Sequence, residues 1–470
     1  MADSQSYEDS GPIVNVELVK QWVYWGIIWT VIFPVVGLVI SIKLNHPEFL
    51  GTSSWLTYGR LQPIHVNGAI LGSFSTSFFG LAFYLLPKLT GIRMVGEKMG
   101  YWALLLWNIG IVLGSYSLAA GFQKGIELGD YALWADLPLF IAFFILTYMV
   151  LGTILKRKEK LLYVSLYYAV AAMVWTAINF PLVNILLPYK APGVNNAALH
   201  GLYSHYIEGL WMTPAALALI YFFLPLAAKN PLNSHKLALV GFWSMAFFYP
   251  FVGIQHYLYS PIPNWTQTVA IVASIMSLIP VLAVTQNFFG TMIGNWRAVQ
   301  ESFVVKFCIL GAIFYLLGAL QASTSALRGM QQLTHFTDYA GSYSHLTIFG
   351  GFAMWTTAGI YYVWPRVTGH ALWSKSLATW HFWLIAVSVS AMAVVLTVMG
   401  LVQGTMWFDS VNFVDTLVAM KPYRLIHSIS GLGSIVGLIL FALNMFMTGA
   451  EPSSLKKVDR EKKLAGAAAD

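Results

Sequence analysis

The sequence predicts an all-α fold, a polytopic membrane helix bundle of about 12 transmembrane helices. Composition is the first reason: 58% of the 470 residues are hydrophobic and only 10% are charged, whereas soluble domains carry about 25% charged residues. The second reason is that apolar runs of roughly 20 residues, the length needed to cross a bilayer, recur along the whole chain. A lipid bilayer is therefore the expected environment of this chain.

Twelve apolar runs give the expected spans in order. They cover residues 21–42, 62–87, 99–122, 134–155, 161–188, 199–228, 237–259, 265–292, 301–325, 340–364, 374–403 and 424–448. Pro214, Pro250 and Pro280 fall inside such runs and predict kinks, which either serve packing alone or border a site. No internal repeat is evident in the sequence.

Lysine and arginine set the expected orientation, because they accumulate on the cytoplasmic side of membrane proteins. With the N-terminus inside, the inside segments are the rich ones, carrying Lys88, Arg93, Lys98, Lys156, Arg157, Lys158, Lys160, Lys456, Lys457, Arg460, Lys462 and Lys463. We expect a multi-pass protein of the cell inner (cytoplasmic) membrane, with a cytoplasmic N-terminal tail at 1–15, one twelve-helix domain at 16–450 and a cytoplasmic C-terminal tail at 451–470. The formal net charge of +7 is concentrated in the cytoplasmic segments, so no nucleic-acid partner is expected.

Four histidines are expected at one depth. Because even-numbered spans enter from the outside, His65, His205 and His345 lie in first turns at the outer side, and His256 lies near the outer end of the seventh span. A lone membrane histidine is usually a hydrogen-bonding core residue. Four at one depth on four helices instead indicate a metal or heme layer, since imidazole is a common neutral ligand of iron and copper.

Other polar residues accompany this outer layer. Arg60 and Arg424 stand at the outer mouths of their spans, where they could pair with heme propionates or simply extend their charged ends to the interface. His427 also lies in the outer layer, whereas His381 falls near the inner end of its span. Cys308 is the only cysteine, so any metal must rely mainly on His, Tyr or carboxylate ligands.

Several motifs are distributed over the second to the eleventh span. They are Arg60-Leu-Gln-Pro-Ile-His65, Tyr84-Leu-Leu-Pro87, Pro263-Asn-Trp-Thr-Gln267, His335-Phe-Thr-Asp-Tyr339, His345-Leu346, Gly359-Ile-Tyr-Tyr362, Pro365-Arg366, Trp380-His-Phe-Trp383 and Gly400-Leu-Val-Gln-Gly404. Together they resemble the catalytic subunit (subunit I) of the heme-copper oxidase and nitric oxide reductase superfamily, especially its C-type (cbb-type) oxidases and nitric oxide reductases. The resemblance implies that His65 and His345 are the axial ligands of a low-spin heme b, where electrons enter.

The resemblance also implies a distal metal with three imidazole ligands, and here that set is changed. His205 matches the first ligand, but the adjacent pair reads Gln255-His256, so an amide replaces one imidazole. Glu208 lies three residues after His205 on the same helix face, and it could join the same ion or donate protons. A carboxylate beside imidazoles favours non-heme iron, with copper as the alternative.

The string His205-Tyr-Ile-Glu208-Gly209-Leu-Trp211 is similar to the nitric oxide reductase helix in which a Glu followed by Gly-x-Trp ligates non-heme iron. The spacing from His to Glu is one residue shorter here, and Ile279 stands where those reductases have a second glutamate. Glu208 could alternatively be a buried, protonated carboxyl group.

The tenth span departs most from the family pattern His-x-His, because it reads Tyr343-Ser344-His345. Tyr343 stands where the resemblance implies the proximal ligand of a second, high-spin b-type heme. Three alternatives stay open: Tyr343 ligates that heme, its iron takes another ligand, or the second heme is absent. Tyr249, seven residues before His256, resembles the redox and proton-donating tyrosine of C-type oxidases, or it is an ordinary buried tyrosine.

These features favour a heme-dependent respiratory nitric oxide reductase, because Gln255 weakens a copper site for oxygen reduction. A divergent terminal oxygen reductase is the first alternative, and a non-catalytic electron-transfer or gas-sensing heme subunit is the second. The expected substrate is a small gas, NO or O2. Since the chain has no heme-attachment Cys-x-x-Cys-His motif, electrons would come from a donor subunit, either a c-type cytochrome or a copper protein, or from quinol.

Overall fold

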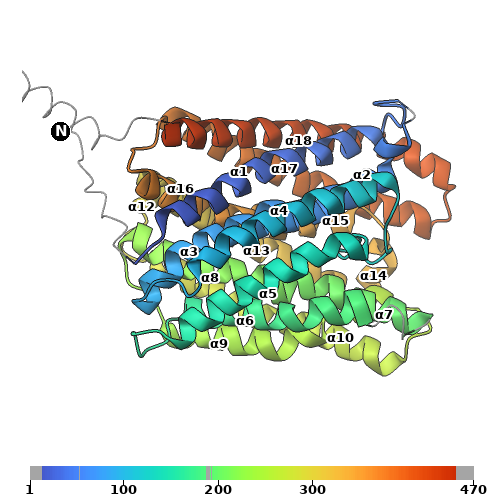
Figure 1. The fold of residues 1–470 in the computed structure, drawn as a ribbon. Coiled ribbons are helices and arrows are strands. Elements are labelled where there is room, and N and C mark those ends of the chain that lie inside the picture. Colours follow the sequence, from blue (N-terminus) through green and yellow to red (C-terminus); the bar gives the residue numbers. More distant parts are fainter. Residues whose placement is uncertain (1–12, 52, 187–190, 192, 451–470) are drawn as a thin grey trace, which may run out of the picture.

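The computed structural model describes residues 13–51, 53–186, 191 and 193–450. Within these residues the only β structure is an isolated bridge between Gln123 and Tyr131. Figure 1 shows long helices running side by side between two faces of the molecule. The expected all-α, polytopic bundle is confirmed. Most of the expected N-terminal tail and the whole C-terminal tail, 451–470, lie outside the described residues.

The elements follow one another in chain order, with 3₁₀ and π segments labelled η. They are α1 (Val16–Lys43), η1 (Ser54–Leu56), α2 (Tyr58–Asn67), η2 (Gly68–Ser75), α3 (Thr76–Thr90), α4 (Glu97–Ala120), α5 (Leu133–Leu155), α6 (Val164–Pro181), η3 (Leu182–Leu186), α7 (Val194–Tyr206), η5 (Ile207–Met212), α8 (Thr213–Ala228), α9 (His235–Phe248), η6 (Tyr249–Phe251), η7 (Ile254–Tyr257), α10 (Asn264–Met276), α11 (Leu278–Thr291), α12 (Ala298–Glu301), α13 (Phe303–Ser325), α14 (Arg328–Thr334), α15 (Tyr339–Ser344), η8 (His345–Ala353), α16 (Met354–Thr368), α17 (Lys375–Phe408) and α18 (Phe413–Ala450).

Each of the twelve predicted spans corresponds to a helical stretch. Within the described residues, eleven stretches are long and apolar enough to cross a membrane, and α15, η8 and α16 form the twelfth. The largest difference is at the last span, where α18 begins at Phe413 rather than at 424. Its first turns carry Asp415 and Lys421, so hydropathy alone places the start of the span too late.

Three units of the chain share the same succession of elements, although the sequence shows no evident repeat. Each unit has a histidine-bearing helix, a π segment, an α-helix with a proline near its end, and a final residue in the left-handed region. The units are His65, η2, α3 and Gly91; His205, η5, α8 and Lys229; and His345, η8, α16 and Gly369. The expectation of no repeat is therefore corrected at the level of structure.

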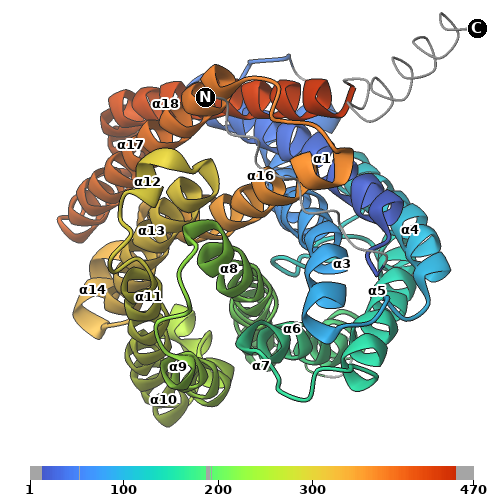
Figure 2. The same ribbon diagram turned by 90° about the vertical axis from the view of Figure 1, so that its left-hand side faces the viewer.

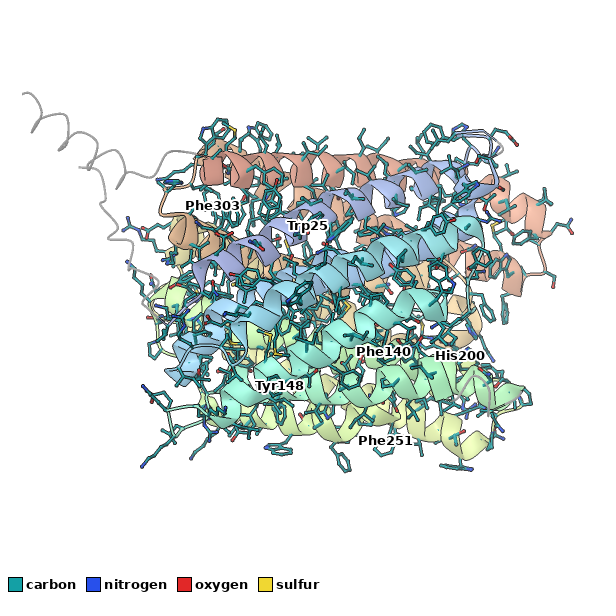
Figure 3. The ribbon with its side chains drawn as sticks, in the orientation of Figure 1. Trp25, Phe140, Tyr148, His200, Phe251 and Phe303 are labelled. Carbon is teal, nitrogen blue, oxygen red and sulfur yellow. The ribbon has the colours of Figure 1, made fainter. Side chains whose placement is uncertain are left out.

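The repeated helices α3, α8 and α16 form the centre of the bundle. They contact one another, and Figure 2, which looks along the bundle, places them close to its middle. In one apolar 18-residue stretch of each of the spans Tyr58–Thr90 and Val194–Ala228, 83% of the residues are buried, against 33% in the corresponding stretch of the peripheral span Val16–Lys43. On the periphery large apolar side chains such as Trp25, Tyr148 and Phe251, labelled in Figure 3, are exposed, as suits a surface in contact with lipid.

The three singled-out prolines all lie at interruptions of α-helix. Pro250 lies in the 3₁₀ segment η6 that follows α9. Pro280 is the third residue of α11, just after the break at Ser277 between α10 and α11. Pro214 lies at the start of α8, directly after the π segment η5. Two of these interruptions, at η5 and η6, border the site described below.

Candidate functional site

A π segment accompanies each histidine of the three repeated units. It begins three residues after His65, two residues after His205 and at His345 itself. π segments widen a helix and occur frequently at functional sites. Sequence reasoning missed them, although glycines inside the segments, such as Gly68, Gly209 and Gly350, were an available signal.

His65 and His345 are both prepared to bind a metal through Nε2. The Nδ1–H of His65 donates to the carbonyl of Phe33 at 2.8 Å, and that of His345 donates to the carbonyl of Gly341 at 2.7 Å. In a neutral imidazole the second nitrogen then keeps its lone pair, which is the arrangement found in metal-ligating histidines. Helix α1 lies close against His65, since a Cβ on Gly37 would stand 2.5 Å from its ring. The pair fits bis-His ligation of a low-spin heme.

A third imidazole joins this pair. The His427 ring lies edge-on to His345, with ring centroids 5.9 Å apart and planes at 86°. Its Nδ1 hydrogen-bonds the hydroxyl of Ser41 at 3.1 Å, and Ser41 also contacts Ser428 at 2.7 Å. The sequence placed His427 in the same layer without assigning it a role. The structure thus gathers three histidines from α2, η8 and α18.

Arg60 and Arg424, the two candidate propionate-binding arginines, have different hydrogen-bond partners. Arg60 donates from Nη1 to the carbonyl of Ala119 at 2.8 Å, at the C-terminal end of α4. Arg424 is buried, its Nη1 lies 3.4 Å from the carbonyl of Leu44, and its Nε is without a partner among the described residues. A buried, unpartnered guanidinium N–H needs an acceptor, and a heme propionate would supply one.

His205 and His256 meet in the distal pocket. Their Nε2 atoms are 2.6 Å apart and their rings stack with centroids 4.7 Å apart. The side-chain nitrogen of Gln255 also approaches His205 Nε2, at 2.9 Å. His205 Nδ1 is buried and has no partner in the described part of the chain. At this distance the two imidazoles share a hydrogen bond, and a metal ion bound by both nitrogens would have to replace that hydrogen bond and move the rings slightly apart.

Glu208 lies in η5, one turn along from His205. Its carboxyl group interacts electrostatically with Tyr249 and with Tyr343. Across the described ranges, no set of three or more His, Cys, Asp or Glu side chains gathers closely enough to hold a metal. The structure therefore brings together His205, His256 and Gln255, and Glu208 directly precedes Gly209, against which the Tyr249 ring packs.

Tyr249 packs against the His205 helix. Its ring centroid lies 6.2 Å from that of His205. The ring occupies the space above Gly209, where a Cβ would stand 1.6 Å from a ring carbon. The absence of a side chain at this glycine lets the tyrosine of η6 reach the distal pocket.

Tyr343 and His256 line one small cavity. The cavity has a volume of about 30 Å³, room for a water molecule, and is also lined by His335, Tyr339 and Gln331. A phenol in this place has the right donor atom for heme iron.

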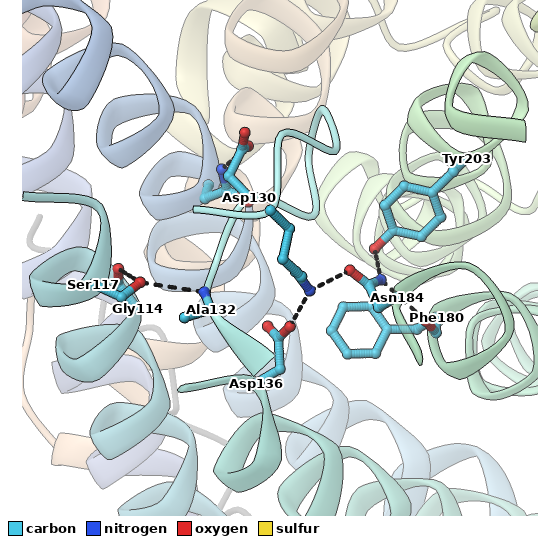
Figure 4. Close-up of polar contacts among 10 residues, drawn as sticks. Gly114, Ser117, Asp130, Ala132, Asp136, Phe180, Asn184 and Tyr203 are labelled. Atoms are coloured by element: carbon cyan, nitrogen blue, oxygen red, sulfur yellow. Dashed lines mark hydrogen bonds and ion pairs between the residues drawn. The ribbon is translucent and has the colours of Figure 1, made fainter. Parts of the chain in front are cut away.

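A polar network joins the loop between α4 and α5 to neighbouring helices (Figure 4). The ammonium of Lys124, in the loop between α4 and α5, pairs with Asp136 and donates to the side-chain oxygen of Asn184 at 2.8 Å. Asn184 donates to the Tyr203 hydroxyl at 2.7 Å. In the same loop Asp130 accepts from Asn67 at 2.7 Å.

This network, the Lys124 network, connects the two ligand-bearing helices. Asn67 lies two residues after His65, and Tyr203 lies two residues before His205. Burial raises the pKa of both Asp130 and Glu127 in the connecting loop, while Asn67 and Lys124 oppose the shift at Asp130. The loop thus holds acidic groups that are poorly hydrated.

Comparison with known proteins gives consistent results. The family described as cytochrome c and quinol oxidase polypeptide I matches residues 17–433. A cytochrome c oxidase subunit 1 homolog of Agrobacterium tumefaciens is 27% identical over 92% of this chain and 83% of its own length. The cbb3-type cytochrome c oxidase subunit CcoN1 of Stutzerimonas stutzeri is 25% identical over 92% of this chain and 94% of its own length.

More distant similarities agree. A nitric oxide reductase subunit of Stutzerimonas stutzeri is 20% identical over 88% of this chain and 91% of its own length. A solved heme-copper terminal oxidase dimer superposes with a TM-score of 0.72 at 14% identity, over 92% of this chain and 84% of that one, which supports the fold. With a family match over most of its length, this chain belongs to the heme-copper oxidase subunit I family, cytochrome c and quinol oxidase polypeptide I.

Proposed function

We propose that this chain is the catalytic subunit of a nitric oxide reductase in the cell inner membrane. The reaction joins two NO molecules, two electrons and two protons into one nitrous oxide and one water. The main support for this proposal is the distal pocket, in which two imidazoles meet an amide instead of a third imidazole. The carboxyl group of Glu208 lies one helical turn after His205. Copper sites for oxygen reduction rely on imidazole nitrogen, and an amide supports copper poorly.

Each residue would have one role. A low-spin heme b would be held by His65 and His345, and Arg424 would pair with one of its propionates. The distal metal, non-heme iron or copper, would be held by His205 and His256. Tyr343 would be the ligand of a second, high-spin b-type heme. When bound, the high-spin heme and the distal metal would supply electrons and bind NO. Glu208, interacting with Tyr249 and Tyr343, would donate protons to the nascent water.

A second candidate is oxygen reduction. Tyr249 favours it, because its ring lies 6.2 Å from that of His205, where a tyrosine could donate an electron and a proton. Several of the similar proteins are also named as oxidases. Oxygen reduction needs four electrons per molecule, and in either case the donor would be a c-type cytochrome or copper-protein subunit, or quinol.

Gas consumption by the purified, chemically reduced protein separates these functions. We expect NO consumption under anaerobic conditions with nitrous oxide as product, and little consumption of O2. Metal analysis should give iron beyond that of the hemes. Rapid O2 consumption with one copper per chain would instead establish the second candidate, and inertness toward both gases would indicate an electron-transfer or gas-sensing subunit.

Glu208→Ala tests the proposed proton donor. We expect the rate of NO reduction to fall by about 10²-fold or more, because a positioned general acid contributes about 10²–10⁴-fold. The low-spin heme spectrum should stay unchanged, since Glu208 lies on a different span from His65 and His345. Glu301→Ala is the control, because that carboxyl group is 60% exposed and pairs with Arg297, the residue directly before α12. Equal rates in both variants would remove Glu208 from the mechanism.

A further inference from the structure

The orientation of the Gln255 amide is fixed by the backbone. Its oxygen Oε1 accepts a hydrogen bond from the N–H of Gly253 at 2.6 Å. Its nitrogen Nε2 therefore points the other way, to His205 Nε2 at 2.9 Å. Rotating the amide by half a turn would set its NH2 group against the Gly253 N–H and leave two buried donors without acceptors.

The segment that carries this amide is held in place. Gly253 has φ +131°, and a Cβ there would stand 2.7 Å from the carbonyl oxygen of Gly201. Gln331 donates from Nε2 to the carbonyl of Gln255 at 3.3 Å, and the Gln255 side chain is itself buried. Neither the backbone nor the side chain is therefore free to turn the amide oxygen toward the imidazoles.

This orientation decides what Gln255 can do. An amide coordinates a metal ion through its oxygen lone pairs, and an amide NH2 group has only hydrogens to offer. The sequence grouped Gln255 with the metal ligands, yet its oxygen accepts from Gly253 and its NH2 group donates to His205 Nε2. A metal ion bound to His205 Nε2 would take up that lone pair, and the NH2 group would then donate to an oxygen or nitrogen atom of a small molecule bound beside His205 and His256.

We propose that only His205 and His256 supply side-chain nitrogen to the distal metal, and that Gln255 is a hydrogen-bond donor to the small ligand bound there. The identity of that ligand in turnover, NO, rests on the proposed function. The division of roles among the three side chains does not. Gln255 would thus be a catalytic residue that stabilises negative charge developing on substrate oxygen.

Two substitutions separate a ligand from a donor. Gln255→Leu keeps roughly the same volume but has neither lone pairs nor N–H groups. Gln255→Glu keeps the acceptor for Gly253 and replaces the NH2 group by an oxygen, which is a good metal ligand and no donor when ionised. His256→Ala removes one imidazole and serves as the variant that must lose the metal.

Metal content per chain is the first readout, and azide affinity, with azide as a small anionic probe, is the second. We expect Gln255→Leu to keep the wild-type metal content, His256→Ala to lose it, and azide to bind Gln255→Leu about tenfold more weakly because one charge-assisted hydrogen bond is gone. Azide should also bind Gln255→Glu more weakly. The bis-His heme spectrum reports whether each variant is folded.

Loss of the metal in Gln255→Leu together with retention in Gln255→Glu would overturn the proposal, because it would show coordination through oxygen. Unchanged azide affinity in Gln255→Leu would also overturn it. The outcome is independent of turnover: a wild-type protein that consumes no NO would refute the proposed function, while retained metal and weakened azide binding in Gln255→Leu would still support the donor role.

Discussion

His65 and His345 each hold Nδ1 against a backbone carbonyl, and this partner determines which nitrogen can meet a metal. The carbonyls belong to Phe33 on the neighbouring helix α1 and to Gly341 one turn earlier in the same span. Both acceptors are backbone oxygens, so substitution of Phe33 or Gly341 would not remove them. The imidazoles themselves are therefore the residues to change.

We expect His65→Ala and His345→Ala each to abolish the bis-His heme spectrum, because one axial ligand cannot hold a low-spin iron. Reduced-minus-oxidised spectra and pyridine hemochrome content of the purified variants measure this. His381→Phe is a matched control: His381 is buried and stacks on Phe441 with ring centroids 4.9 Å apart, which phenylalanine can keep, while only the hydrogen bond between His381 Nδ1 and the Tyr361 hydroxyl is lost. A normal spectrum in His65→Ala would exclude His65 as a ligand.

At the scale of residues, the sequence predicted that His205, His256 and Gln255 share a pocket, as they do in the structure, and their role in metal binding stays a prediction. The sequence could not predict how their atoms are oriented. Imidazoles in a membrane span cost free energy unless they bind something, so His65, His205, His256 and His345 stand out by type and depth. The orientation of Gln255, in contrast, depends on one backbone N–H whose direction follows from the turn at Gly253. Residue type alone does not carry that information.

At the scale of elements, hydropathy predicted the spans well because the bilayer requires long apolar helices. It could not predict the π segments, since a π segment changes the number of residues per turn and leaves the composition as it is. Glycine at η5 shows why local geometry matters there: Gly209 leaves the space into which Tyr249 packs.

Gly209→Ala tests this packing. The added Cβ would stand 1.6 Å from the Tyr249 ring, so the ring or η5 must shift, at a cost of about 1–3 kcal/mol. We expect a lower thermal unfolding midpoint and slower NO reduction. Gly59→Ala is the control, because no described atom lies within 4 Å of its added Cβ and alanine favours the helix α2. Equal midpoints for the two variants would contradict the close approach of Tyr249.

At the scale of the whole molecule, the three repeated units place α3, α8 and α16 at the centre (Figure 2). The histidine-bearing helices α2 and α7 lie toward the same end of the bundle (Figure 1). His65, His205 and His345 are spaced by 140 residues, but the sequences around them differ enough that the repeat is visible only in the structure. The order of helix, π segment and helix recurs in all three units, while the side chains around each histidine differ from unit to unit.

The Lys124 network joins two of these units, and it should therefore contribute to the stability of the whole bundle. Lys124 and Asp136 have side chains only 15% and 3% exposed, so Lys124→Met would leave a buried carboxylate unpaired, at a cost of about 3–5 kcal/mol. We expect a clear drop in the thermal unfolding midpoint in detergent. The double variant Lys124→Met/Asp136→Asn removes both charges and should recover most of that loss, because a neutral amide can still hydrogen-bond. A double variant as unstable as Lys124→Met would mean that the Lys124 side chain acts through packing, since the buried charge would then contribute nothing.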